Sequence, residues 1–422
     1  MNTKTYDCGL RLIHEQNSTI KAVAVKIYCL AGGRDEDDSN RGIAHLLEHM
    51  FFKGTNKRTS REINLTFDRL GVMINAFTAN DLTSYHTEGL VEHLDTMIEV
   101  MADCLYNSTY PKEELDKEKT VVCSELQMYE NEYADVAQTN GLIVALQGTG
   151  YDYVLGGTVE SVSKIESKDL IAFRDKWYTP NRIVVSVCGD VEFEKVDSLV
   201  QKWLIPQGAI DSLPITFCRE NMDIDIKKRY LFESKQTDQV YGVINYRSIN
   251  KSHKDVVAYN LGRLALGSTA SSRLFTKLRE EHGLVYVISA NPTLFGDCGV
   301  NSVTFIASEK NASKAMELIK QTIDEVKKDG FTQEELDAYK NIYKSTLVLY
   351  SQSISSKAAK NAEAIIYTEN NFDVEAKFSE IDAVTLDDMN RVFREFYDSK
   401  YLTIALVAKE DKIDALQIFC EE

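Results

Sequence analysis

Hydrophobic and polar positions follow two different periods along the chain. Segments rich in β-branched residues, with apolar side chains at alternate positions, predict strands, and they lie at 21–30, 72–78, 182–188, 239–245 and 301–307. Apolar residues recur at helical spacing between them, at 40–53, 61–70, 92–106, 112–130, 167–177, 254–265, 312–328 and 333–348. Thr59 and Glu62 have the spacing of a capping box before the helix at 61–70. Strands mixed with long helices favour an α+β fold over a doubly wound parallel sheet.

The chain also contains an internal repeat, which determines the expected architecture. The segment YPKEELDKEK at 110–119 matches FTQEELDAYK at 331–340, 221 residues later. A second set of matching positions is separated by 219 residues: Asp169 and Trp177-Tyr178 recur as Asp388 and Phe396-Tyr397. Two offsets near half the chain length indicate a duplication, so we expect two homologous domains, each built of α and β layers.

The boundary between these domains is predicted where prolines and a glycine interrupt the pattern and the chain turns polar. The predicted parts are an N-terminal domain at 1–205, a linker at 206–235 and a C-terminal domain at 236–422. A length of 422 residues exceeds what one core usually serves. Hydrophobic residues make up 44% and charged residues 27%, which excludes a disordered or collagen-like chain.

Charge and cysteine usage limit the partners and the kinds of site that the protein is expected to have. The net charge of −17 argues against nucleic-acid binding and permits attraction of basic peptides, although ordinary solubility charge explains it equally well. The eight cysteines are scattered without a C-x-x-C pair, so buried thiols are expected rather than disulfides or a cysteine zinc site. No stretch approaches the roughly 20 apolar residues of a membrane span. The N-terminus lacks the features of a signal peptide or presequence, and we expect a cytoplasmic protein.

The candidate chemistry lies in the sequence His45-Leu46-Leu47-Glu48-His49. Residues four apart on a helix share a face, so His45 and His49 can bind one metal ion while Glu48 reaches the same site. The order H-x-x-E-H is the inverse of the commoner H-E-x-x-H zinc motif. A solvated helix face could carry the three residues by coincidence. With 7 histidines in the chain, the spacing arises by chance on the order of 0.01 times, which favours a metal site.

A catalytic zinc ion ordinarily takes three protein ligands and keeps a position for water. The third ligand must therefore come from elsewhere in the chain. Glu118 and Glu125 lie seven residues apart on one face of the helix predicted at 112–130. By pattern alone each is an ordinary solvated charge, and the spacing does not choose between them.

The motif resembles that of the pitrilysin and insulysin family of zinc metallopeptidases, which includes the mitochondrial processing peptidases. In that family the ligand glutamate follows the motif by 76 residues, which is the separation of Glu125 from His49. Glu118 then falls at the family's accessory acidic position. Further matching blocks extend over most of the chain, at 33–36, 42–50, 52–55, 75–78, 178–181 and 189–190. The resemblance implies the short type with two homologous domains, one half of a clamshell.

The resemblance also implies roles for these residues. Zinc held by His45, His49 and Glu125 would lower the pKa of a bound water toward about 7 and polarise the scissile carbonyl. Glu48 would act as the general base and return the proton to the leaving amine. Glu118 would orient a ligand histidine, with exposure to solvent as the alternative.

Two further segments match the family's substrate-binding elements. The segment Asn75-Ala76-Phe77-Thr78 is similar to the exposed strand beside the zinc, to which an extended peptide would add through backbone hydrogen bonds. From periodicity alone it is an ordinary strand. Arg279 and Tyr286 match the carbonyl-binding pair of a second signature, in which tyrosine donates to the developing oxyanion and arginine binds a substrate carbonyl. The alternative is a helical salt bridge and a half-buried tyrosine.

The second repeat lacks the metal ligands, because Tyr339 and Thr346 stand where the first has Glu118 and Glu125. One zinc ion per chain is therefore expected. The expected function is a zinc endopeptidase acting on peptides or unfolded segments, and the alternative is a non-catalytic binding or scaffold subunit of a peptidase complex. The resemblance implies a homodimer, or a heterodimer with an inactive homologous chain, and neither nucleic acid nor membrane is an expected partner.

Overall fold

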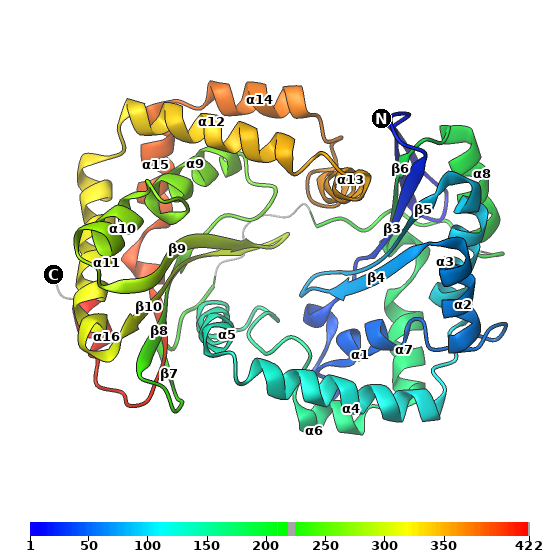
Figure 1. Cartoon of the computed structure of the whole chain (residues 1–422), viewed down its shortest axis with the longest axis horizontal. Helices are drawn as coiled ribbons and strands as arrows, with labels where there is room; N and C mark the ends of the chain where they lie inside the picture. Colours follow the sequence, from blue (N-terminus) through cyan, green and yellow to red (C-terminus); the bar gives the residue numbers. More distant parts are fainter. Residues whose placement is uncertain (209, 218–223, 421–422) are drawn as a thin grey trace. The chain divides into compact units, whose positions relative to one another are not determined.

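The computed structural model of the chain describes residues 1–208, 210–217 and 224–420. The chain forms two compact units, and each combines segments from both halves of the sequence. The first unit contains Met1–Leu126, Val154–Phe217 and Leu349–Phe372, and the second contains Gln127–Tyr153, Cys218–Val348 and Asp373–Glu422. Figure 1 shows helices and strands mixed in both units. The predicted α+β class is confirmed.

The first unit is built on a six-stranded sheet with the order β1-β2-β6-β3-β5-β4. Its strands are β1 (Asn2–Thr5), β2 (Arg11–Gln16), β3 (Ala22–Cys29), β4 (Met73–Thr78), β5 (Thr83–Leu90) and β6 (Ile183–Gly189). Its helices are α1 (Ile43–Met50), α2 (Ser60–Leu70), α3 (Leu94–Asn107), most of α4 (Lys112–Tyr129), α6 (Val159–Lys164), α7 (Ser167–Trp177), α8 (Phe193–Trp203) and α13 (Ile354–Thr368). Strand β4 is at the edge of the sheet and pairs with β5 alone.

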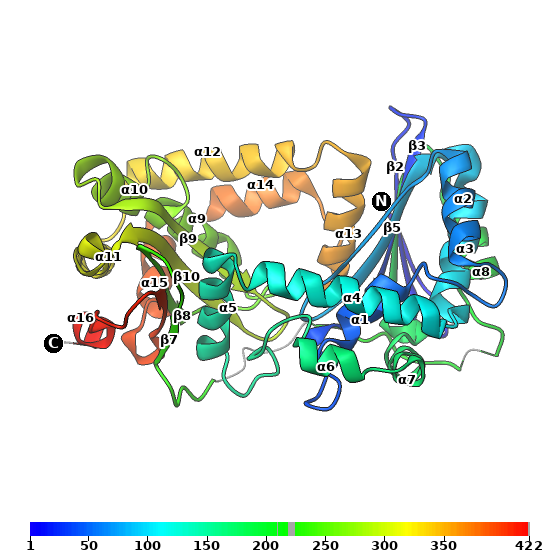
Figure 2. The same cartoon turned by 60° about the horizontal axis from the view of Figure 1, so that its bottom comes forward.

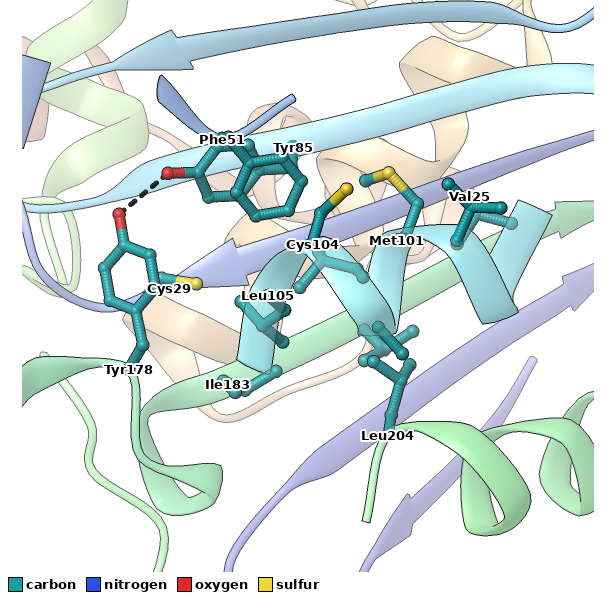
Figure 3. Packing of buried hydrophobic residues seen from close by; sticks show 14 of the residues in the cluster. Val25, Cys29, Phe51, Tyr85, Met101, Cys104, Leu105, Tyr178, Ile183 and Leu204 are labelled. Carbon is teal, nitrogen blue, oxygen red and sulfur yellow. Dashed lines mark hydrogen bonds between the residues drawn. The ribbon is translucent and has the colours of Figure 1, made fainter. Parts of the chain in front are cut away.

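The main core of the first unit joins α1 to the sheet. Alternate residues of β3, including Val25 and Cys29, pack with apolar residues of α1 and α3 (Figure 3). Directly after α1, Phe51 stacks on Tyr85 of β5 with ring centroids 3.6 Å apart. The Tyr85 hydroxyl is 2.9 Å from the Tyr178 hydroxyl, so both buried hydroxyls have a partner. These contacts fix the end of α1 relative to the strands.

The second unit has a five-stranded sheet with the order β7-β11-β8-β10-β9. Its strands are β7 (Tyr230–Ser234), β8 (Gln239–Arg247), β9 (Val285–Leu294), β10 (Gly299–Ser308) and β11 (Thr403–Ala408). Its helices are α5 (Tyr133–Ala145), α9 (Val256–Gly267), α10 (Arg273–Phe275), α11 (Glu309–Asp329), most of α12 (Gln333–Leu349), α14 (Val374–Ala383), α15 (Leu386–Phe396) and α16 (Ala415–Cys420).

Among the helices of the described residues, none combines the length and apolar character that a membrane span requires.

The two sheets share one pattern of pairing, as the internal repeat predicts. In the first, β6 is parallel to β2 and antiparallel to β3. In the second, β11 is parallel to β7 and antiparallel to β8. Each sheet then continues through two antiparallel strands to an edge, which is β4 in the first and β9 in the second.

Each unit includes one helix from the opposite half of the sequence. Helix α13 packs on the sheet of the first unit, where Ile354 and Ala358 bury Ala24 and Cys188. Helix α5 packs on β8 and β11 of the second unit, and Asn245 Nδ2 donates to the Gly141 carbonyl at 2.9 Å. The compact units therefore differ from the contiguous division at 1–205 and 236–422, which stays a prediction about the sequence repeats.

The predicted linker at 206–235 is only partly described, because residues 209 and 218–223, including Cys218, lie outside the described residues. Its C-terminal end contains β7, which pairs with β11 and is thus part of the second sheet. The segments 210–217 and 224–229 contain neither helix nor strand. The six cysteines whose side chains the structure describes are free thiols, and all but Cys123 are buried.

Candidate metal centre

Helix α1 carries the H-x-x-E-H motif, and its residues outside the motif histidines and glutamate are buried. Ile43, Ala44, Leu46, Leu47 and Met50 face the core. This leaves His45, Glu48 and His49 half-buried on the remaining face. The helical spacing predicted from the sequence therefore places the three motif side chains on one face.

A buried carboxylate supports the start of α1. Glu36 is 7% exposed, and its two oxygens accept hydrogen bonds from the backbone N–H groups of Gly42 at 2.8 Å and Ala44 at 2.9 Å. These N–H groups have no partner within the helix. Gly42 has a φ of 91°, a left-handed conformation that favours glycine. Burial raises the pKa of Glu36 to about 7.

The candidate metal ligands converge between α1 and α4. Glu125 Oε2 lies 3.4 Å from His49 Nε2 and 3.9 Å from His45 Nε2. All three donor atoms lie within 4.8 Å of one another, the one such group of three among the described residues. Two ligand atoms about 2.0–2.2 Å from one tetrahedral zinc ion would be roughly 3.3–3.6 Å apart. The distance from Glu125 to His49 has this value and the distance from Glu125 to His45 is slightly longer. Two imidazole nitrogens and one carboxylate oxygen are donor types that fit zinc.

The protonation of His45 also fits a metal ligand. Burial, followed by the nearby His49 ring, lowers the pKa of His45 to about 4. The imidazole is then neutral near pH 7, so a nitrogen lone pair is free to bind a cation. The Nε2 atom of His45 is the one near Glu125, at 3.9 Å. The Nδ1 atom is buried and has no hydrogen-bond partner among the described residues.

Glu48 lies beside this group without belonging to it. One of its carboxylate oxygens accepts a hydrogen bond from Thr78 Oγ1 at 2.9 Å, which connects α1 to the end of β4. Burial raises the pKa of the Glu48 carboxyl. A raised carboxyl pKa is closer to working pH, which suits a general base.

Glu118 contacts the nitrogen of His49 that faces away from the metal position. Its Oε2 is 3.3 Å from His49 Nδ1, on the opposite side of the ring from Glu125. Its Oε1 accepts from Lys53 Nζ at 2.6 Å. The Glu118 side chain is only 12% exposed, so it does not simply face solvent.

The predicted substrate strand is β4, the edge strand of the first sheet. Asn75 and Phe77 are exposed, whereas Ile74 and Ala76 pack against the core. Thr78 ends the strand and contacts Glu48, as described above. Since β4 pairs on one side only, its free edge can accept an additional strand. The Ala76 N–H would first have to leave Asn75 Oδ1, to which it donates at 2.8 Å.

Arg279 and Tyr286 belong to the second unit. Arg279 lies in a π-helical segment, Thr276–Glu281, a conformation frequent at functional sites. Its Nη1 donates to the Tyr286 carbonyl at 2.9 Å, and its guanidinium lies over the Phe275 ring. Tyr286 is 72% exposed on β9, so the alternative of a half-buried tyrosine is wrong.

Sequence reasoning assigned no role to three residues that contact the site. Glu36 supports α1, and Lys53 binds Glu118. Gly156 has a φ of 92°, and a Cβ there would lie 3.2 Å from His45 Nδ1. Lys53 and Glu36 fall within the family blocks at 52–55 and 33–36, and Gly156-Gly157 is a turn signal. These signals mark the positions but do not reveal the contacts.

Replacing Glu36 with Gln is expected to lower the free energy of unfolding by about 1–3 kcal/mol, because the amide has one acceptor for two backbone donors. The loss is expected to be larger at pH 5 than at pH 8. The folded-state pKa of about 7 lies above the ordinary value of 4.5. The stability linked to the protonated carboxyl is therefore full below pH 4.5 and is lost as the pH rises through 7.

Urea unfolding of the metal-free protein at both pH values measures this effect. The control is Glu62→Gln, which alters the capping box at the exposed start of α2. Equal losses in the two variants would mean that the Glu36 contacts contribute no more than an ordinary cap.

Comparison with known proteins gives consistent matches. Residues 11–158 match the family model described as Insulinase (Peptidase family M16), and residues 164–343 match the one described as Peptidase M16 inactive domain. The Bacillus subtilis protein named Uncharacterized zinc protease YmxG is 30% identical over 407 residues, which cover 96% of this chain and 98% of that protein. Subunit 1 of the mitochondrial cytochrome b-c1 complex of Caenorhabditis elegans is 25% identical, with 92% and 84% covered.

The fold is likewise shared with a solved structure. The crystal structure of a protease from Helicobacter pylori superposes with a TM-score of 0.86 at 22% identity, over 96% of this chain and 99% of that one. At this identity the match concerns the fold alone.

Proposed function

Because the chain belongs to the insulinase family of M16 peptidases, as its motif predicted, we propose that it is a zinc-dependent endopeptidase. The observation that carries this proposal is the convergence of His45, His49 and Glu125 on one point, with Glu48 beside them. Relatives named zinc proteases support the choice of metal.

The chain's own residues supply most of the chemistry. When bound by His45, His49 and Glu125, zinc would supply Lewis acidity for water activation and carbonyl polarisation. Glu48 takes the proton of the attacking water and gives it to the leaving amine. Thr78 holds the Glu48 carboxylate through its hydroxyl, and Glu118 holds the His49 ring through Nδ1.

The substrate is proposed to bind as an extended strand at the free edge of β4. Backbone hydrogen bonds to 75–78 would hold peptides of varied sequence in the same direction. Arg279 and Tyr286 are proposed to bind the substrate carbonyl and the developing oxyanion, respectively. Tyr286 is available for this because most of its side chain is exposed.

A non-catalytic subunit is the second candidate. It is favoured by the match to a subunit of the cytochrome b-c1 complex. The complete set of His45, Glu48, His49 and Glu125 in this chain supports the peptidase instead, since a scaffold has no need of metal ligands. We further propose a cytoplasmic homodimer, with a heterodimer containing an inactive homologous chain as the alternative assembly.

Removing zinc is expected to abolish cleavage of a mixed library of peptides blocked at both ends. Blocked ends restrict detection to internal cleavage, and a chelator removes the ion that the three ligands require. Adding one equivalent of zinc per chain should restore the products, whereas magnesium should not, because it prefers oxygen ligands. Mass spectrometry of products and metal analysis provide the measurements.

Cleavage that persists in the chelated protein would contradict the proposal. Stoichiometric peptide binding without products, in protein that contains zinc, would favour the scaffold subunit instead.

A further inference from the structure

The two candidate histidine ligands are supported unequally by the protein. His45 Nδ1 is buried and accepts or donates no hydrogen bond among the described residues. His49 Nδ1 faces Glu118 Oε2 at 3.3 Å. When Nε2 of a histidine binds a metal, Nδ1 carries the proton and needs an acceptor to fix the ring. Glu118 supplies that acceptor for His49.

The other oxygen of Glu118 is bound by Lys53, a lysine just after the end of α1. Lys53 Nζ lies 2.6 Å from Glu118 Oε1, and the side chains are 28% and 12% exposed, respectively. Lys53 follows α1 by three residues, and its backbone N–H donates to the Met50 carbonyl. Two residues before Lys53, Phe51 is buried and stacks on Tyr85. The backbone at Lys53 is therefore held near the end of the helix that carries His49.

We infer that Lys53 is a positioning residue for the metal ligand His49 and acts through Glu118. The contacts form a closed path from α1 through Lys53 and Glu118 of α4 back to His49. Lys53 keeps one oxygen of Glu118 in place, so the other remains directed at His49 Nδ1. This inference rests on the proposed zinc site but concerns metal affinity and not the chemical step.

The alternative is an ordinary surface ion pair, which contributes roughly 0–1 kcal/mol and leaves the metal site unaffected. The chain contains a matched example on the same helix. Lys117 Nζ also lies 2.6 Å from a glutamate of α4, Glu114. Among the described residues, neither member of that pair contacts His45 or His49, and Lys117 is 66% exposed. Lys117 therefore controls for the loss of one lysine near α4.

Lys53→Met is expected to weaken zinc binding about 3- to 10-fold, less than the roughly 10–100-fold that loss of a direct ligand partner causes. Lys117→Met is expected to bind zinc as the wild type does. Competition with a chromogenic chelator measures zinc affinity in the full chain, independently of peptide cleavage. Lys53→Arg should recover part of the affinity, because it keeps a cation near Glu118.

A double-mutant cycle tests the path through Glu118. In a Glu118→Gln background, Lys53→Met should cause no further loss of zinc affinity, since the two residues act in series. An unchanged affinity in Lys53→Met, an equal loss in Lys117→Met, or additive losses in the double variant would overturn the inference. In all three cases the proposed function stands if wild type binds zinc and cleaves peptides. A wild type that binds no zinc would instead contradict the proposed function itself.

Discussion

Glu48→Gln is expected to lower kcat/KM for peptide cleavage by about 10²–10⁴-fold, the usual contribution of a general base. The amide has nearly the same shape as the carboxylate, and its oxygen can still accept from Thr78 Oγ1. It cannot take a proton from water at neutral pH. Zinc content should remain at one ion per chain, because Glu48 is not among the three converging ligands. Product formation and metal analysis on the same preparation check both expectations.

The matched control for this variant is Glu114→Gln on α4. Glu114 pairs with Lys117 and has no role in the proposed site, so its cleavage rate should equal that of the wild type. Equal cleavage by wild type and Glu48→Gln would remove Glu48 as the base. Loss of zinc together with activity would show that Glu48 helps to hold the ion and would leave its role as base unsupported.

The face of α1 was predictable from sequence because it depends only on helical spacing. His45, Glu48 and His49 recur at i, i+3 and i+4, and the burial of Leu46 and Leu47 determines which side faces inward. The third ligand was not predictable in this way. Glu118 and Glu125 share a face of α4, and the direction in which α4 crosses α1 decides which of them meets Nε2 and which meets Nδ1 of His49. Family resemblance, and not spacing, assigned Glu125.

The contacts of Glu36 and Lys53 were also not predictable from sequence, because they depend on how distant segments pack. Lys53 and Glu118 are far apart in sequence, and nothing in the local pattern of either residue indicates the other. Glu36 lies in a polar segment that resembles a solvated loop, yet it is buried because two backbone donors of α1 require its oxygens.

For the fold, period-2 segments correctly indicated β3, β4, β6, β8 and β10. Strands β1, β2, β5, β7, β9 and β11 and several helices were not predicted. Among these helices, α5 and α13 each cover a sheet. Each buries one stripe at helical spacing, but alanine and glycine make up much of it, at Ala137, Gly141 and Ala145 in α5 and at Ala358 and Ala362 in α13, so its hydrophobic signal in the sequence is weak. Their assignment to opposite units depends on packing between distant segments, which the internal repeat at 110–119 and 331–340 does not reveal. Local periodicity therefore predicts some of the elements, but not the units to which they belong.

Glu125→Ala is expected to abolish stoichiometric zinc binding and, with it, all peptide cleavage. Two histidines alone leave a zinc site without the third protein ligand that catalytic sites ordinarily use. The affinity loss should exceed the roughly 10–100-fold expected for Glu118→Gln, which removes a ligand's partner and not a ligand. The fold should tolerate the change, because the Glu125 side chain is 34% exposed and alanine has the highest helix propensity.

Thermal unfolding with and without zinc separates this loss from misfolding. An ion that binds only the folded state stabilises it by about 2.7 kcal/mol at a free concentration of 100 Kd. Zinc should therefore raise the Tm of the wild type but not that of Glu125→Ala, while the two metal-free proteins should unfold at similar temperatures. Glu113→Ala, at an exposed position in the first turn of the same helix, should keep the zinc-dependent shift. A shift retained in Glu125→Ala would mean that His45 and His49 bind the ion with a different third ligand. Glu125 would then not belong to the metal site.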